Sequence, residues 1–142
     1  MTYLLDVNVL IALIDPTHIS HEDAHRWFQT GGKSSWATCP ITENGVVRIV
    51  GHPRYPNSPG SPAVVAAVLQ QLCCLPGHVF WPDDISALDP SHIEADRMIA
   101  AGQVTDTYLL ALAVAHGGQL ASLDRRLSVA AVPGGEDALH LL

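Results

Sequence analysis

Four acidic residues of this chain lie where apolar strands end or on apolar helix faces. They are Asp6, Glu43, Asp106 and Asp124. Burying an ionised carboxylate is costly unless a partner offsets its charge, and the whole chain has only 7 Lys and Arg residues. A divalent cation is a suitable partner, and Mg²⁺ or Mn²⁺ matches clusters of carboxylates and waters better than Zn²⁺ does. The pattern therefore predicts a metal site, and the chemistry such a site supports is attack by a metal-activated water.

Each carboxylate also has a purely structural interpretation. Asp106 alone is a residue favoured by the dipole at a helix N-terminus, and Asp6 alone caps the helix that follows it. Asp124 alone is a turn residue, and Glu43 alone is a half-buried helix residue. Four separate structural roles explain the placement of all four residues less well than one shared site does.

Short apolar strands alternate with helices along the chain, and no internal repeat is present. This order is typical of βαβ units and predicts an α/β fold with a mainly parallel sheet. In such sheets ligands gather beyond the carboxyl ends of the strands, where the acidic residues fall. The expected strands are residues 3–5, 35–38, 79–81, 119–123 and an edge strand at 138–142. The expected helices are 7–14, 21–30, 40–50, 62–74, 90–101 and 106–116, the last of them capped by Thr105.

The composition indicates an ordinary globular protein. The 142 residues leave room for one domain over residues 1–142, and the 48% of hydrophobic residues argues against intrinsic disorder. The net charge of −7 argues against a large basic face for nucleic acid. It remains compatible with a nucleic-acid enzyme whose acidic residues are concentrated on metal ions.

The cysteines and the N-terminus bear on the compartment. The chain has three cysteines, Cys39, Cys73 and Cys74, and two of them are adjacent. An odd count with this spacing favours neither a disulfide framework nor a zinc knuckle. The N-terminus lacks the features of a signal peptide, and no run of about 18 uncharged apolar residues is present. We expect a cytoplasmic protein with no membrane contact.

Four stretches around the acidic residues resemble the signature blocks of PIN-domain ribonucleases. They are LLDVNVL at 4–10, TENGVVR at 42–48, TDTYLLALA at 105–113 and SLDRRL at 122–127. More narrowly, the chain is similar over residues 3–130 to the VapC toxins of bacterial type II VapBC toxin–antitoxin systems. One such block would be a weak signal, whereas four in the family's order and spacing are specific.

The resemblance implies a three-layer α/β/α sandwich and a Mg²⁺- or Mn²⁺-dependent endoribonuclease. Asp6, Glu43, Asp106 and Asp124 match the family's catalytic quartet. The three aspartates would hold one ion, and Glu43 would serve a second ion or act through water. A metal-activated water would attack the phosphate in line and leave 5′-phosphate and 3′-hydroxyl ends. The implied partners are RNA, a VapB-like antitoxin and a second copy of the chain, with promoter DNA contacted only through the antitoxin.

Further residues support this predicted site. Asn8 matches the polar residue that braces the first aspartate, and Ser122 matches a position that is often Thr, Ser or Asp. Thr105 precedes the third acidic residue. Three arginines are candidate phosphate contacts, and a solvated surface role suits them equally well: Arg48, Arg125 and Arg126.

Two other functions deserve comparison. A haloacid-dehalogenase-like phosphatase would use Asp6 as nucleophile, but Asn8 stands where that family has a second aspartate, and Lys33 is the only lysine. A catalytically degenerate PIN module would act by binding RNA or the ribosome, and the intact quartet disfavours it.

A histidine cluster lies outside the four blocks. His21 and His25 are four residues apart and share a helix face, with His18 nearby. A zinc pair is one interpretation. We favour a solvated or rim-lining helix face because no third ligand stands at motif spacing.

Overall fold

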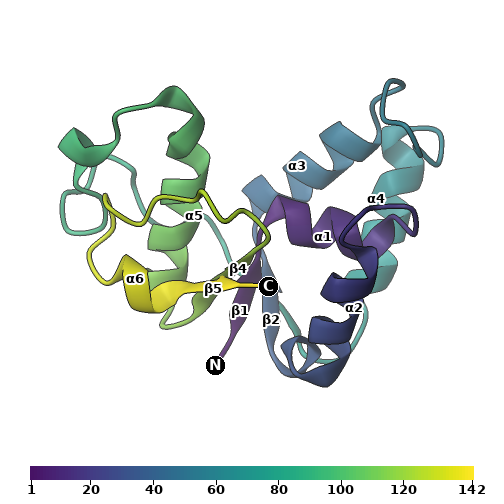
Figure 1. Ribbon diagram of the computed structural model, residues 1–142, viewed down its shortest axis with the longest axis horizontal. Helices are drawn as coiled ribbons and strands as arrows, with labels where there is room; N and C mark the ends of the chain where they lie inside the picture. Colours follow the sequence, from purple (N-terminus) through teal and green to yellow (C-terminus); the bar gives the residue numbers. More distant parts are fainter.

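A five-stranded parallel sheet with strand order β3-β2-β1-β4-β5 forms the centre of the computed structural model, which covers residues 1–142 (Figure 1). All four neighbouring pairs of strands are parallel. Because β1 lies in the middle, the residues that follow β1, β2 and β4 meet at the same edge of the sheet. The strands are β1 (Tyr3–Leu5), β2 (Trp36–Thr38), β3 (His78–Phe80), β4 (Gln119–Ser122) and β5 (Leu139–Leu141).

Helices cover both faces of the sheet and complete three layers. In Figure 1 the first four helices lie on one side of the strands and the last two on the other. This arrangement confirms the expected α/β/α sandwich and the expected edge strand, which proves to be parallel to its neighbour. The helices are α1 (Val7–Ile14), α2 (His21–Thr30), α3 (Pro40–Val50), α4 (Pro62–Cys73), α5 (Val104–Ala115) and α6 (Gly135–Ala138). None of them is both long and apolar enough to cross a lipid bilayer.

The apolar core is divided by the sheet into two clusters. Successive residues of a strand point to opposite faces, so Leu4 packs with Leu109 and Leu120 on the α5 side. Leu5 packs with Leu10 on the other side. Strand β1 is therefore buried on both faces, as its continuous apolar sequence predicts.

The predicted helix at 90–101 is wrong. This segment forms turns and two short 3₁₀ segments, Ala95–Arg97 and Ala101–Gln103. The backbone N–H of Glu94 donates to the carbonyl of Ala131 at 2.8 Å rather than to a carbonyl one turn earlier. A tertiary contact thus replaces the hydrogen-bond ladder that a helix would need.

The predicted start of α5 is also slightly wrong. The helix begins at Val104, so the residue that precedes it is Gln103 and not Thr105. Thr105 lies in the first turn and is exposed. Asp106 remains in the first turn of the helix, where the dipole favours an acidic residue.

The histidines of α2 are not a solvated face. His21 Nδ1 lies 2.7 Å from the carbonyl oxygen of Ala12, and His25 Nε2 lies 3.0 Å from that of Leu13. These carbonyls are in the last turn of α1, where no intrahelical partner is left for them. The two rings, 4.3 Å apart, therefore cap α1 and fasten α2 to it. No third ligating side chain forms a metal-binding group with these two histidines.

Asp15, directly after α1, fastens the proline-rich loop. It is buried, and its carboxylate accepts hydrogen bonds from Tyr55 Oη, from Asn57 Nδ2 at 2.8 Å, and from the N–H and hydroxyl of Thr17. Burial acts to raise the pKa of Asp15, but the hydrogen bonds together outweigh it and lower the pKa to about 2. The ionised form is the one that holds the loop.

We expect Asp15→Asn to destabilise the fold by about 1–3 kcal/mol, because the amide cannot accept the same set of hydrogen bonds. The folded pKa of about 2 lies below the unfolded value, so this stabilisation is present above pH ~4 and is lost as the pH falls toward 2. Urea unfolding at several pH values measures the effect. The difference between wild type and variant should shrink from pH 5 to pH 2, and a constant difference would contradict the assignment. Asp23→Asn, at an exposed pair with Arg26, is the matched control.

Candidate active site

Asp6 lies at the carboxyl end of the central strand and at the start of α1. One carboxylate oxygen accepts from the backbone N–H of Val7 at 2.8 Å, and the other accepts from Ser122 Oγ at 2.7 Å. The side chain is 5% exposed. Burial raises the pKa of Asp6, and the charge of Asp124 adds to this, while both hydrogen bonds act in the opposite direction. Asp6 therefore caps α1 and, at the same time, lies close enough to Asp124 to share a site with it.

Ser122, at the end of β4, links the first and last aspartates. Its buried hydroxyl donates to Asp6 and accepts from the backbone N–H of Asp124 at 3.1 Å. It also accepts from Asn8 Nδ2 at 3.3 Å, and Asn8 Oδ1 accepts from the N–H of Leu123. Asn8 thus acts on Asp6 through Ser122 and not by direct contact. This network fixes the orientation of Asp6 before any ligand binds.

Asp106 approaches the other two aspartates from the first turn of α5. Burial raises the pKa of Asp106 to about 6, and the negative charges of Asp6 and Asp124 contribute to the shift. No Lys, Arg or His forms a salt bridge with any of the three carboxylates. The structure therefore gathers three acidic groups whose mutual repulsion the protein leaves uncompensated.

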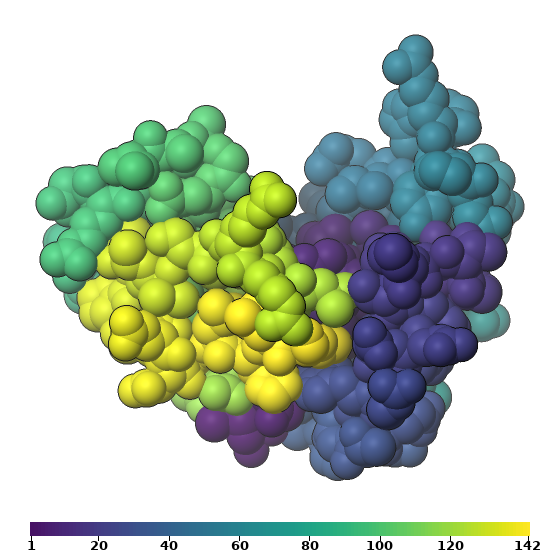
Figure 2. All heavy atoms as spheres, in the orientation of Figure 1, coloured from purple at the N-terminus to yellow at the C-terminus, as the bar shows by residue number.

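A hollow of about 470 Å³ opens beside two of these aspartates. Asp6 and Asp106 line it together with Thr105 and with Arg48 of α3. In Figure 2 the surface is hollowed between the green segment that includes the start of α5 and the blue segment that includes α3. A ligand in this hollow would meet two carboxylates and one guanidinium group.

The other two candidate arginines are placed differently. Arg125 Nη2 donates to the carbonyl oxygen of Leu142 at 3.1 Å, at the C-terminus of the chain. Arg126 is exposed, and its backbone N–H donates to Asp124 at 2.9 Å. Of the three predicted phosphate contacts, Arg48 alone lines the hollow.

Gly45 allows α3 to pack close to α1. A Cβ at this position would lie 2.8 Å from Cγ2 of Val7, which directly follows Asp6. The absence of a side chain therefore brings the helix that carries Glu43 and Arg48 close to the aspartates. No sequence pattern around Gly45 indicates this role.

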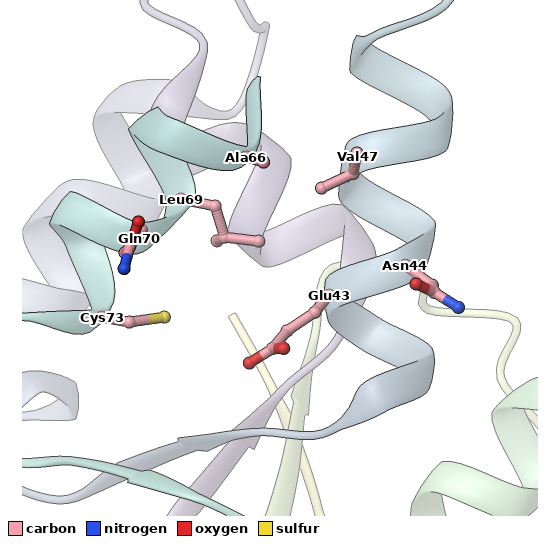
Figure 3. A pocket seen from close by; sticks show the side chains of 7 residues that line it. All are labelled: Glu43, Asn44, Val47, Ala66, Leu69, Gln70 and Cys73. Carbon is pink, nitrogen blue, oxygen red and sulfur yellow. The ribbon is translucent and has the colours of Figure 1, made fainter. Parts of the chain in front are cut away.

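Glu43 lies in an adjoining hollow and not with the three aspartates. It lines a separate cavity of about 320 Å³, and its carboxylate points toward Cys73 (Figure 3). Thr38 Oγ1 donates to Glu43 Oε2 at 2.7 Å. Asn44 points away from Cys73 in Figure 3 and lines both hollows, so the two hollows adjoin along α3.

Sequence reasoning missed the groups that surround Glu43. His78 Nε2 lies 2.8 Å from Thr38 Oγ1, and Cys73 faces the same carboxylate. Burial raises the pKa of the Cys73 thiol, with a further contribution from the charge of Glu43, and burial lowers the pKa of His78. No local motif indicates this cluster, because Glu43 lies 30 residues before Cys73 and 35 before His78 and meets them only through the fold.

Sequence and structure comparisons find relatives over nearly the whole chain. The sequence model of the PIN domain family matches residues 3–133. Ribonuclease VapC44 of Mycobacterium tuberculosis is 46% identical over 134 residues, which cover 94% of each chain. Ribonuclease VapC39 of the same organism is 43% identical over 134 residues, 94% of this chain and 96% of its own.

A solved structure shares the fold at low sequence identity. It is the crystal structure of VapBC2 from Rickettsia felis bound to a DNA fragment from their promoter. The match covers 100% of this chain and 99% of that chain, with a TM-score of 0.61 and 11% identity. At this identity the likeness concerns the fold alone.

Proposed function

The chain belongs to the PIN domain family, and on this premise we propose that it is the toxin of a type II toxin–antitoxin system, an endoribonuclease that uses Mg²⁺ or Mn²⁺ to hydrolyse RNA. The observation that carries the proposal is the group of Asp6, Asp106 and Asp124, three carboxylates with no basic partner beside an open hollow. Relatives that are named ribonucleases over nearly their whole length support the reaction class.

The donor set fits a hard divalent cation. Asp6, Asp106 and Asp124 come from three different elements and offer only oxygen ligands, which Mg²⁺ and Mn²⁺ prefer. These three residues would hold the ion. When bound, such an ion lowers the pKa of a coordinated water and offsets the charge of the phosphate.

The protein itself supplies orientation and phosphate contacts. The hydroxyl of Ser122 and the N–H of Val7 hold the two oxygens of Asp6 in place, so this ligand needs no rearrangement. Arg48 lies on the rim of the hollow, where its guanidinium can bind a phosphate of the RNA backbone. Without metal, the negative charges of Asp6 and Asp106 in the hollow, and of Asp124 nearby, repel an incoming phosphate, so the metal-free chain should bind RNA weakly.

An antitoxin is the proposed protein partner. A basic side chain of the antitoxin that entered the carboxylate group would offset the same charge as the metal does. The family resemblance further suggests a homodimer and contact with promoter DNA through the antitoxin only. The antitoxin would then inhibit by occupying the metal site.

The alternative of a catalytically degenerate PIN module that acts by binding RNA or the ribosome is not favoured. A degenerate scaffold has no reason to keep three neighbouring carboxylates when burial, together with their mutual repulsion, raises the pKa of Asp106 to about 6. Family membership also removes the basis for a phosphatase with Asp6 as nucleophile.

The test incubates purified, antitoxin-free protein with total bacterial RNA in Mg²⁺, Mn²⁺ or EDTA, and maps the new 5′ ends. We expect discrete cuts with 5′-phosphate ends in either metal and none in EDTA. Cuts that persist in EDTA would contradict the proposal. Growth arrest by a chain that makes no cuts would instead favour the binding module.

A further inference from the structure

Glu43, Cys73 and His78 form a second cluster of ligating side chains. One carboxylate oxygen, the thiol sulfur and one ring nitrogen all lie within 4.8 Å of one another. The three residues come from α3, the last turn of α4 and the start of β3, and all are half-buried. In Figure 3 the Cys73 sulfur and the Glu43 carboxylate face each other across the hollow. Three different kinds of ligand therefore converge on one point that water can reach.

Two of these ligands are already held in position by the sheet. The His78 ring packs on the indole of Trp36, its partner in the neighbouring strand, with ring centroids 4.6 Å apart. The fully buried Thr38 hydroxyl accepts from His78 Nε2 and donates to Glu43 Oε2. Because a strand residue anchors both side chains, little rearrangement is needed for a shared ion.

The chemistry of this donor set differs from that of the aspartates. Thiolate, imidazole and carboxylate are the ligands that Zn²⁺ takes, whereas Mg²⁺ binds oxygen. Bonds of about 2.0–2.3 Å in a tetrahedron place ligand atoms roughly 3.3–3.7 Å apart. Because the ligand atoms lie within 4.8 Å of one another, reaching these separations requires movements of no more than about 1 Å, within the reach of side-chain rotation.

We propose that Glu43, Cys73 and His78 form a zinc site whose fourth position is open to water. On binding, the Cys73 thiol loses its proton to solvent and binds as the thiolate. Neutral His78 binds through the ring nitrogen that carries no proton, which is Nδ1 while Nε2–H donates to Thr38; binding through Nε2 requires the other tautomer and the loss of that hydrogen bond. The hydroxyl of Thr38 keeps its hydrogen bond to Glu43 and orients that ligand from outside the coordination sphere.

This site would also restrain the nuclease. Zinc would hold the Glu43 carboxylate toward Cys73, on the far side of α3 from the hollow that Asp6 and Asp106 line. Glu43 could then no longer turn toward the aspartates to serve a second ion. This consequence rests on the proposed function, whereas zinc binding itself does not.

The test titrates the full-length, antitoxin-free chain with Co²⁺, whose thiolate complexes absorb in the near ultraviolet, and then displaces it with Zn²⁺. We expect a thiolate band that saturates at one Co²⁺ per chain and that Zn²⁺ abolishes, whereas Co²⁺ held by the aspartates gives no such band. Cys73→Ser and His78→Gln should weaken zinc binding by at least about 100-fold, the upper end of what loss of an outer partner costs. Cys74→Ser removes the exposed neighbouring thiol and should leave binding unchanged. Circular dichroism establishes that each variant is folded.

The outcomes separate the zinc site from the nuclease. A missing thiolate band, or a band unchanged in Cys73→Ser, would overturn the site. Metal that binds through Asp106 and not through Cys73 would overturn it too. In the cleavage assay with Mg²⁺, added Zn²⁺ should inhibit the wild type, and Cys73→Ser should resist. Zinc binding by a chain that cuts no RNA would refute only the proposed function.

Discussion

Replacing Asp106 by Asn is expected to reduce RNA cleavage by at least about 100-fold, the scale on which loss of one preorganised electrostatic group acts. The amide has nearly the same shape as the carboxylate, but it carries no charge to hold a divalent ion with Asp6 and Asp124. The side chain is half-buried in the first turn of α5 and makes no hydrogen bond that the fold depends on. The mapped 5′ ends in total RNA, compared with those made by the wild type, measure the effect.

The same substitution should make the metal-free protein more stable. The folded pKa of Asp106, about 6, lies above the unfolded value near 4, so ionisation opposes folding as the pH rises from about 4 to 6 and remains unfavourable above that range. Removing the charge should therefore increase the free energy of unfolding at pH 7.5 by on the order of 1–2 kcal/mol, after allowance for solvent screening. Urea unfolding in EDTA measures this gain.

Loss of activity combined with a gain in stability distinguishes a functional carboxylate from a structural one. Asp96→Asn removes the same charge from an exposed position and serves as the matched control. It should change neither cleavage nor stability. An Asp106→Asn variant that cuts RNA at the normal rate would refute the site. One that unfolds more easily than the wild type would show that Asp106 serves the fold instead.

The strand ends were predictable because their signals are local. The apolar run of β1 ends at Asp6, and the run of β4 ends at Ser122, two residues before Asp124. Parallel pairing of β1 with β4 then brings both aspartates to one edge of the sheet without further information. Helix α5 is similarly clear, because its apolar sequence is long enough to bury seven consecutive residues.

The direction of the Glu43 side chain was not predictable in this way. Its position on a helix close to the aspartates follows from the sequence, but its carboxylate can turn to either side of α3. Thr38 sets that direction in this structure, and Thr38 is itself anchored to His78 on the neighbouring strand. The same limitation applies to the α2 histidines, whose partners are carbonyls at the end of α1. In both cases the deciding contact is tertiary.

Magnesium should stabilise the fold through the aspartates and not through Glu43. Binding to the folded state alone adds about 2.7 kcal/mol at a metal concentration 100 times the dissociation constant. We expect Mg²⁺ to raise the melting temperature of the wild type and of Asp96→Asn. The response should be largely lost in Asp106→Asn and Asp124→Asn, because each lacks one of the three charged ligands. EDTA should stop cleavage without unfolding the chain, and added Mg²⁺ should restore it.

Cys73→Ser decides which cluster the magnesium occupies. Mg²⁺ disfavours sulfur, so this variant should keep the full magnesium response and the full recovery of cleavage after EDTA, although it has lost its zinc. Equal stabilisation of the wild type and of Asp124→Asn would place the ion away from the aspartates. A magnesium response lost in Cys73→Ser would mean that the two hollows bind metal as one unit. In that case ligand chemistry alone would not explain why one site prefers Mg²⁺ and the other Zn²⁺.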